Sequence, residues 1–362
     1  HVGAEEVIVG ERLERREQRA GGGPDRGALV CAGRRRSVGR GHLGSVSALG
    51  SPTVAPVVAV VGGGQLARMM QQAAIRLGVH LRALVEAADG STGQVVPDAP
   101  VGRADDPAAV RGILPGAHAL TFEHEHVPGA LLQELEAEGV AVRPGSFALR
   151  HAQDKIVMRT GISELGVPCP RWAPVSSRAE LADFGARAGW PVVVKTARGG
   201  YDGKGVRVVH DDDGATDWLD RLAPGEALLA EEHVPFVREL AALVARRPSG
   251  EIRAWVVAQT IQRDGVCAEV IAPAPGLDPV LAEQAQEIAV RIAEGLDVTG
   301  VLAVELFEVA DGGAGGSRLL VNELAMRPHN SGHWTIDGAA TSQFEQHLRA
   351  VLDLPLGPTD PR

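Results

Sequence analysis

A glycine-rich loop between two apolar runs carries the residues best suited to binding phosphate. Trp190–Lys195 predicts a strand that ends in a lysine, and Val206–Val209 predicts a second strand. The connecting loop holds four glycines, which let backbone amides approach phosphate oxygens, and a cation at Lys204. No GK[ST] sequence opens a helix here, so the loop is not a Walker A motif. The pattern predicts a hairpin flap that covers phosphates; the alternative is a flexible hairpin with a solvated basic tip.

Two carboxylates interrupt apolar runs near the end of the chain. Glu305 lies within Val301–Phe307, and Glu323 lies within Arg318–Leu324 with Asn322 beside it. If these segments are neighbouring antiparallel strands, the two carboxylates can meet on one face. Buried carboxylates need a partner, and an oxygen-preferring cation such as Mg²⁺ carrying nucleotide phosphates would be a fitting one. The alternative is two solvated positions on an open sheet face.

Two further segments offer polar groups that suit a nucleotide or an anion. Ala227–Val234 predicts a strand that runs into acidic residues, and Glu239 follows it. A strand edge with a carboxylate suits an adenine and ribose hydroxyls. Arg327–Trp334 is a constrained polar loop whose Arg, His and Asn side chains suit anionic oxygens. Ser331 lacks the GxSxG elbow of a serine hydrolase, so this reaction class is not expected.

A small doubly wound α/β unit is predicted to precede these segments. Its expected elements are a buried strand, a glycine turn, a helix and two more strands, at 57–61, 62–64, 65–77, 80–86 and 119–122 respectively. The amides of the glycine turn could face an anion, but Ala67 occupies the third glycine position of a dinucleotide fingerprint. Glu86 would hold a ribose in a dehydrogenase. Glu123–Val127 contains two histidines and two acids, but no third ligand is evident, so a metal is not expected there.

Composition separates the first 55 residues from the rest. They contain nine arginines against six acidic residues, whereas the whole chain of 362 residues has a formal net charge of −10. A disordered or artefactual leader is expected, with a helix over Ala4–Ala20 or a basic arm as alternatives. The overall charge does not favour a nucleic-acid partner, and no apolar run is long enough to predict a membrane span. The separated Cys31, Cys169 and Cys267 predict neither a disulfide framework nor a zinc ribbon, which fits a reducing cytoplasm.

The order of these motifs resembles the ATP-grasp superfamily and, within it, the N5-carboxyaminoimidazole ribonucleotide synthetases. The resemblance extends over about residues 57–358 and is carried by Gly62–Met69, Gln153–Lys155, Lys195, Gly199–Gly205, Glu231–Pro235, Asn322–Thr335 and Ser342–His347. It implies an α/β fold in which a Rossmann-like parallel-sheet domain, a pre-ATP-grasp domain, precedes an ATP-grasp fold. The expected boundaries are 56–150 for the first domain, 151–225 for the small ATP-grasp subdomain with the flap, and 226–362 for the large subdomain.

The resemblance implies a ligase of purine biosynthesis that uses ATP and bicarbonate to carboxylate 5-aminoimidazole ribonucleotide through carboxyphosphate. Mg²⁺ would be bound by Glu305 and Glu323. ATP would be bound by Arg150, Lys195, Gly199, Gly200, Tyr201, Asp202, Gly203, Lys204, Glu231, Glu232, His233, Val234, Glu239, Asn322 and Glu323. The ribonucleotide would meet Gln65, Tyr201, Asp202, Arg327 and His329, and the catalytic groups would be Arg327, His329, Asn330 and Lys204. A cytoplasmic homodimer and a hand-off to N5-carboxyaminoimidazole ribonucleotide mutase are further expectations.

Three departures from the family pattern are visible. Ala67 replaces a glycine, Met326 replaces a proline, and the family continues beyond Pro355 with a basic segment that helps bind the ribonucleotide phosphate. We therefore expect a fragment or frameshifted reading in which ATP binding survives better than turnover. The alternatives are another ATP-grasp ligase, a nicotinamide dehydrogenase, or a truncated, non-catalytic ATP-binding protein.

Overall fold

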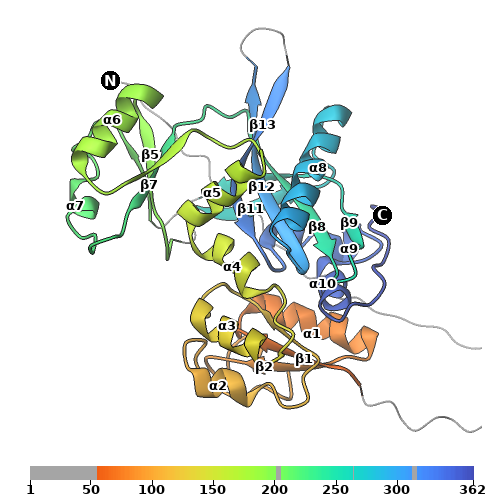
Figure 1. Cartoon of the computed structure of the whole chain (residues 1–362). Helices are drawn as coiled ribbons and strands as arrows, with labels where there is room; N and C mark the ends of the chain where they lie inside the picture. The colour runs from red at the N-terminus through yellow and green to blue at the C-terminus, as the bar shows by residue number, and fades with distance from the viewer. Residues whose placement is uncertain (1–54, 201–204, 264, 312–315) are drawn as a thin grey trace, which may run out of the picture. The chain divides into compact units, whose positions relative to one another are not determined.

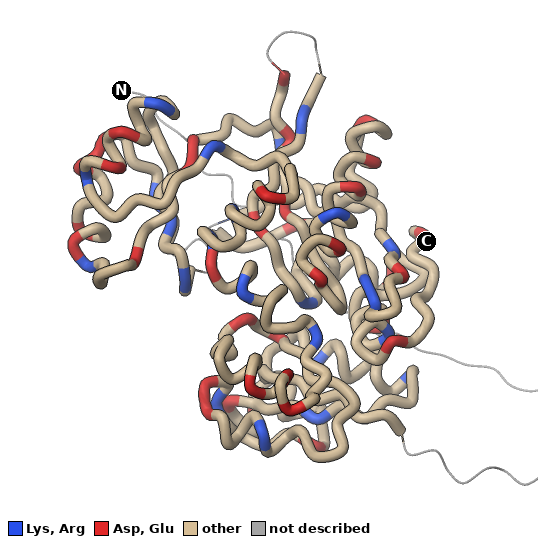
Figure 2. Tube along the Cα trace, in the orientation of Figure 1, with Lys and Arg blue, Asp and Glu red and all other residues tan. Residues whose placement is uncertain are grey.

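The computed structural model describes residues 55–200, 205–263, 265–311 and 316–362, which form three β-sheets with flanking helices (Figure 1). The expected leader, with its suggested helix, lies outside these residues apart from residue 55. Within the described ranges, no helix has both the length and the apolar character needed to cross a bilayer. Acidic and basic residues are interspersed along the described trace (Figure 2).

The first sheet is parallel, with strand order β2-β1-β3. Its strands are β1 (Val57–Val61), β2 (His80–Leu84) and β3 (Ala119–Phe122), and its helices are α1 (Gln65–Leu77), α2 (Pro107–Gly112) and α3 (Gly129–Ala137). These bounds confirm the predicted first strand, the helix and the third strand. The second strand ends two residues before Glu86, because Val85 forms only an isolated bridge with Val101.

Two helices meet at one residue and lead out of this sheet. Asp154 ends α4 (Ser146–Gln153) and begins α5 (Lys155–Glu164), where its carboxylate accepts from the amides of Ile156 at 3.0 Å and Val157 at 3.1 Å. This cap satisfies two of the amides that a helix start leaves free. It therefore fixes the direction in which α5 leaves toward the next two sheets.

The second sheet is four-stranded and antiparallel, in the order β4-β7-β5-β6. Its strands are β4 (Trp172–Val175), β5 (Val192–Thr196), β6 (Val206–Val209) and β7 (Leu228–Glu232), and its helices are α6 (Arg178–Ala188) and α7 (Thr216–Leu219). The predicted hairpin of β5 and β6 is confirmed, as is the strand before the acidic residues. Because β7 pairs with both β4 and β5, this sheet extends past the expected boundary at residue 225, to Glu232.

The third sheet runs β11-β10-β8-β12-β13, with β9 paired to β8. Its strands are β8 (Arg238–Arg246), β9 (Ile252–Ala254), β10 (Ala258–Arg263), β11 (Val266–Ile271), β12 (Gly300–Ala310) and β13 (Ser317–Ala325), with helix α8 (Pro279–Gly295). β12 and β13 are antiparallel neighbours, as the carboxylate pattern required. The core uses small aliphatic side chains, consistent with an aromatic content of 3%.

The chain then returns to the first sheet. After a short 3₁₀ turn (Asn330–Gly332) and α9 (Thr335–Gly338), α10 (Gln343–Val351) packs its buried Phe344 and Leu348 with Met70 of α1. His347 of α10 has no exposed surface, and its imidazole links two sheets. Its Nε2 lies 2.8 Å from the hydroxyl of Thr121 on β3, and its Nδ1 accepts from the amide of Val301 on β12 at 3.1 Å. The first and third sheets are thus tied together through α10.

Candidate active site

A cavity of about 970 Å³ lies where segments of the three sheets converge. Residues far apart in the sequence line it, including Gln65 after β1, Lys195 on β5 and Glu323 on β13. The predicted site residues that line it are Gln65, Lys195, Gly199, Gly200, Glu231, Glu232, His233, Val234, Glu239, Glu305, Asn322, Glu323, Arg327, His329 and Asn330. Tyr201, Asp202, Gly203 and Lys204 lie outside the described residues.

Arg150 is the one described residue of the predicted set that does not line the cavity. It is exposed on α4, and its guanidinium lies 4.4 Å from the centre of the Phe147 ring on the same helix. This cation–π contact holds the side chain along its own helix. The structure therefore does not bring Arg150 to the other predicted nucleotide ligands.

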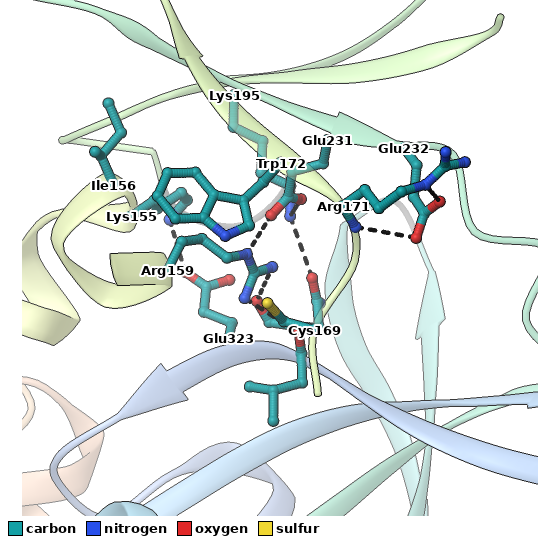
Figure 3. Close-up of polar contacts among 12 residues, drawn as sticks. Lys155, Ile156, Arg159, Cys169, Arg171, Trp172, Lys195, Glu231, Glu232 and Glu323 are labelled. Carbon is teal, nitrogen blue, oxygen red and sulfur yellow. Dashed lines mark hydrogen bonds and ion pairs between the residues drawn. The ribbon is translucent and has the colours of Figure 1, made fainter. Parts of the chain in front are cut away.

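A buried ionic cluster lies at the wall between the second and third sheets (Figure 3). Lys195 Nζ lies 2.7 Å from Glu231 Oε2 and donates to Asn322 Oδ1 at 3.2 Å. Arg159 of α5 contacts the other oxygen of Glu231. Burial alone would raise the pKa of Glu231, but the charges of Arg159 and Lys195 outweigh it and lower the pKa below its usual value. Glu231 therefore stays ionised although only 4% of its side chain is exposed.

Glu305 and Glu323 are direct partners in the register of β12 and β13. Burial, followed by the charge of Glu323, raises the pKa of Glu305 to about 7. For Glu323, attraction to Lys155 outweighs burial and lowers the pKa. The cause is direct, because Lys155 Nζ donates to Glu323 Oε1 at 2.7 Å.

A divalent cation fits this pair of carboxyls. Two carboxylates that cannot both ionise without cost, with the amide of Asn322 beside them, form an oxygen donor set suited to Mg²⁺. No cluster of three or more His, Cys, Asp or Glu side chains within the described ranges could hold a metal ion. A cation at Glu305 and Glu323 would therefore take its remaining oxygen ligands from a bound substrate or water.

The cavity has an apolar end that also carries the carboxylate of Glu239. Phe307 and Phe236 stack with ring centres 4.7 Å apart and an angle of 9° between their planes. Both rings line the cavity together with Val234 and Glu239. Burial raises the pKa of Glu239, and no charged side chain in the described part of the chain offsets this shift. A flat apolar surface beside a carboxylate with free acceptor capacity suits a base and its ribose hydroxyls.

Glu232 and His233 complete the strand at this end of the cavity. The side chain of Glu232 is tied to Arg171, whose Nε donates to Oε2 at 2.6 Å and whose backbone amide donates to Oε1 at 3.0 Å. These contacts fix the backbone after β7, while His233 is exposed to the cavity. This segment can therefore offer backbone groups to a ligand.

The polar loop after β13 is held by contacts that its own sequence does not predict. Arg327 Nε forms an ion pair with Glu125 Oε1 at 2.8 Å. The side chain of Gln343 binds the backbone of His329 twice, since its Oε1 accepts from the amide at 2.9 Å and its Nε2 donates to the carbonyl at 2.7 Å. Gln65 Nε2 donates to Asn330 Oδ1 at 3.4 Å, which joins this loop to the start of α1.

His329 is a neutral imidazole in this loop. Burial, followed by the charge of Arg327, lowers its pKa to about 3. The Ser331 amide donates to Nδ1 at 3.4 Å, so we assign the ring proton to Nε2, which lies 3.4 Å from Glu305 Oε1. The ring can thus present a donor to the cavity without adding a charge.

The glycine turn after β1 binds protein carboxylates in place of a phosphate. The amides of Gly64 and Leu66 donate to Glu123 at 3.0 and 3.2 Å, and the amide of Gly63 donates to Glu86 at 3.1 Å. The anion-binding capacity of this helix start is therefore used internally. The turn thus faces anions, as its pattern allowed, but these are the carboxylates of Glu123 and Glu86, and Glu86 is not free to act as the ribose ligand that the dehydrogenase alternative required.

Comparison with known proteins agrees with this arrangement. Residues 56–153 match the ribonucleotide synthetase preATP-grasp domain, and residues 160–344 match the ATP-grasp domain. An N5-carboxyaminoimidazole ribonucleotide synthase from Mycobacterium tuberculosis is 58% identical over 85% of this chain and 71% of its own length. The chain belongs to this family. Its membership confirms the expected ATP-grasp ligase and the preATP-grasp domain in front of it.

Further relatives and solved structures carry the same description. The synthase from Corynebacterium ammoniagenes is 51% identical over 84% of this chain and 74% of its own length. The Thermus thermophilus synthetase matches with a TM-score of 0.76 and 39% identity, over 84% of this chain and 81% of that one. The Aspergillus clavatus synthase, solved with ADP and 5-aminoimidazole ribonucleotide, matches with a TM-score of 0.76 and 31% identity, over 85% and 80%.

The sequence analysis did not predict the contacts of several residues that build the site. It considered Glu123 and Glu125 only as metal ligands, noted Gln343 only within a family motif and did not single out Arg159. Glu123, Glu125, Arg159 and Gln343 all act on site residues through contacts across the fold. The one available signal was chemical, because charged or amide side chains in apolar surroundings need partners. Lys155 was noted as part of a family motif, but its pairing with Glu323 was not predicted.

Proposed function

We propose that the cavity binds ATP with Mg²⁺, bicarbonate and 5-aminoimidazole ribonucleotide, and that the chain produces N5-carboxyaminoimidazole ribonucleotide. The observation that carries this proposal is the convergence of Lys195, the Glu305–Glu323 pair and the Arg327–Asn330 loop on one cavity. The ligands named for the Aspergillus clavatus synthase support the same assignment.

The residues divide by chemistry along the cavity. We assign the base and ribose to the apolar end, where Phe307, Val234 and Glu239 lie. Lys195 and the described flap glycines, Gly199 and Gly200, would face the phosphates. The remaining flap residues, Tyr201–Lys204, are assigned to phosphate and ribonucleotide binding by family resemblance alone, as is Arg150.

The reaction needs positioning and charge neutralisation more than a protein nucleophile. A bicarbonate oxygen attacks the γ-phosphorus, the bond to the β-phosphate oxygen breaks, and ADP leaves with that electron pair. The exocyclic amine of the ribonucleotide then forms a bond to the carboxyl carbon, either in carboxyphosphate, with phosphate as leaving group, or in CO₂ released from it. The proton that the amine loses passes to phosphate. Mg²⁺ held by Glu305 and Glu323 would supply charge neutralisation on the phosphates.

The polar loop is assigned to the anionic co-substrates. Arg327 would orient bicarbonate or carboxyphosphate, and neutral His329 would donate a hydrogen bond from Nε2. Asn330 and Gln65, which already contact each other, would face the ribonucleotide. Gln343 would hold His329 in place through its two backbone contacts.

The deciding experiment measures ADP release by the purified chain with ATP, Mg²⁺ and bicarbonate, with and without 5-aminoimidazole ribonucleotide. Using ¹³C-bicarbonate, we expect ribonucleotide-dependent ADP release and a labelled carboxylated product by mass spectrometry. An ADP release rate that is the same with and without the ribonucleotide would point to another ATP-grasp ligase. ATP binding without turnover would support a non-catalytic ATP-binding protein.

We further propose that the chain works as a cytoplasmic homodimer and passes its product to N5-carboxyaminoimidazole ribonucleotide mutase. Family membership supports this proposal. Sedimentation of the purified chain tests the dimer, and a coupled assay with and without the mutase tests the hand-off. An active chain that sediments as a monomer would argue against the dimer. A coupled rate no faster than free diffusion of the product allows would argue against the hand-off.

A further inference from the structure

Arg159 is the most deeply buried cation of the described chain that contacts a predicted site residue, and the function proposed above leaves it unused. It lies on α5, one helical turn after Lys155, and its side chain has no exposed surface. It does not line the cavity, whereas Lys195 and Glu231 do. Arg159 therefore cannot touch a ligand there and can act only through its neighbours.

The guanidinium connects two sheets. Its Nε donates to Glu231 Oε1 on β7 at 2.5 Å, and its two terminal nitrogens donate to the carbonyls of Val321 at 3.1 Å and Asn322 at 2.8 Å on β13. Figure 3 shows the side chain between these strands, with Lys195 on the other side of Glu231. The planar fork of arginine suits such a three-point contact, which an ammonium group cannot reproduce.

Glu231 divides its two oxygens between two cations. Oε1 faces Arg159, and Oε2 lies 2.7 Å from Lys195 Nζ. Within the trio of Arg159, Glu231 and Lys195, one negative charge thus meets two positive charges. The next carboxylate that acts on Lys195, Glu323, has a cation of its own in Lys155. Because Arg159 is sealed from the cavity and Lys195 is on its wall, the remaining positive charge of the trio is directed into the cavity.

We propose that Arg159 is a positioning residue that neutralises Glu231 from the buried side, so that the charge of Lys195 remains available to nucleotide phosphates. Without Arg159, Glu231 would pair with Lys195 alone and compete with phosphate for it. The two carbonyl contacts also hold this pair in register with Glu323, the next residue of β13. This inference rests on the proposed function, because it takes phosphate as the ligand of Lys195.

The test separates the phosphate end of the ligand from its nucleoside end. Affinities for ADP and adenosine are measured with Mg²⁺ on the full chain and on Arg159→Met. We expect ADP binding to weaken about tenfold or more, the usual effect of losing a charge-assisted hydrogen bond, while adenosine binding changes less than about twofold. Equal weakening of both ligands, or no weakening of either, would overturn the proposal.

A matched control exists in the first sheet. Arg82 also contacts one carboxylate and two carbonyls, since it binds Asp98 at 2.7 Å, Ile113 at 3.1 Å and Pro115 at 2.8 Å. It does not line the cavity. Arg82→Met is expected to lower thermal stability without changing the ratio of ADP to adenosine affinity, and a matching change in that ratio would make the Arg159 effect non-specific.

Two further variants keep the proposal testable if Arg159→Met does not fold. Arg159→Lys retains the buried charge, so its affinity ratio should stay near that of the unmodified chain, and loss of the ratio in the folded variant counts against the proposal. In a Glu231→Gln background the buried carboxylate is absent, so adding Arg159→Met should leave the ratio unchanged. A further tenfold loss in that background contradicts action through Glu231.

The unmodified chain distinguishes the two levels of failure. If it binds ADP no better than adenosine, the cavity does not recognise phosphate and the proposed function fails. If it prefers ADP and Arg159→Met keeps that preference, only the role of Arg159 fails.

Discussion

Glu305 on β12 lies directly opposite Glu323 on β13, and the pKa values of the two carboxyls shift in opposite directions. Lys155 compensates Glu323, whereas Glu305 faces the carboxylate of Glu323 and a neutral imidazole. At neutral pH the pair therefore carries about half a proton more than two free carboxylates would, because Glu305 is about half protonated when the pH equals its pKa. Binding of a divalent cation would remove that proton.

The first prediction concerns the pH dependence of stability through Glu305. Its folded pKa of about 7 lies above the ordinary value of 4.5, so the protonated form favours folding. This contribution is fully present below about pH 4.5 and is lost as the pH rises through 7, up to about 3 kcal/mol. Glu305→Gln should therefore stabilise the chain at pH 8 relative to pH 5, measured by chemical denaturation in a chelator.

Glu269 offers the control for this measurement, because half of its side chain is exposed on β11. Glu269→Gln should give the same small change at both pH values. If Glu305→Gln also gives equal changes at pH 5 and pH 8, then Glu305 is an ordinary solvated carboxylate, and the case for a cation site weakens.

The second prediction concerns the nucleoside end of the cavity. Glu239 has a pKa raised by burial alone and lies beside the stacked Phe236 and Phe307 rings. Glu239→Ala should weaken adenosine, ADP and ATP about equally, by roughly tenfold, because a hydrogen bond to a ribose hydroxyl is common to all three. Isothermal titration with each ligand checks this, and loss confined to ADP and ATP would place Glu239 near the phosphates instead.

The third prediction separates nucleotide binding from carboxyl transfer. Arg327 lies on the cavity wall in an ion pair with Glu125. Arg327→Met should lower kcat by about a hundredfold, the scale expected when one preorganised donor to a developing charge is removed, with ADP affinity unchanged. Arg318→Met serves as the control, because Arg318 lies on β13, the strand before this loop, and is half exposed near Asp311. An unchanged kcat would remove Arg327 from the reaction.

The fourth prediction concerns acid stability. Burial lowers the pKa of His347 to about 3. The unfolded chain therefore binds a proton at this histidine near pH 6.5, whereas the folded chain binds it only near pH 3. Stability from this group is therefore complete above about pH 6.5 and falls as the pH drops toward 3. His347→Gln should be less stable at pH 7 but show a shallower loss between pH 6.5 and 4.5. A slope equal to that of the unmodified chain would show that other groups cause the acid sensitivity.

Local sequence determined much of this protein. Apolar runs and glycine turns predicted β1, α1, β12 and β13 because their side-chain periodicity is a property of the segment itself. The single carboxylates within the apolar runs of β12 and β13 predicted that Glu305 and Glu323 lie close together, because neighbouring antiparallel strands bring residues of the same face side by side. The motif order also pointed to the family before any contact was known.

Only the tertiary structure decided which charges meet. Glu123 contacts the glycine turn from 59 residues away, and Arg159 contacts Glu231 across 72 residues. Such pairings depend on how helices and sheets pack, and no local pattern records them. The membership of β7 in the second sheet has the same origin, because hydrogen bonding to β4 and β5 decides it. The sequence thus specified the reactive residue types, and packing decided which cation each buried carboxylate meets.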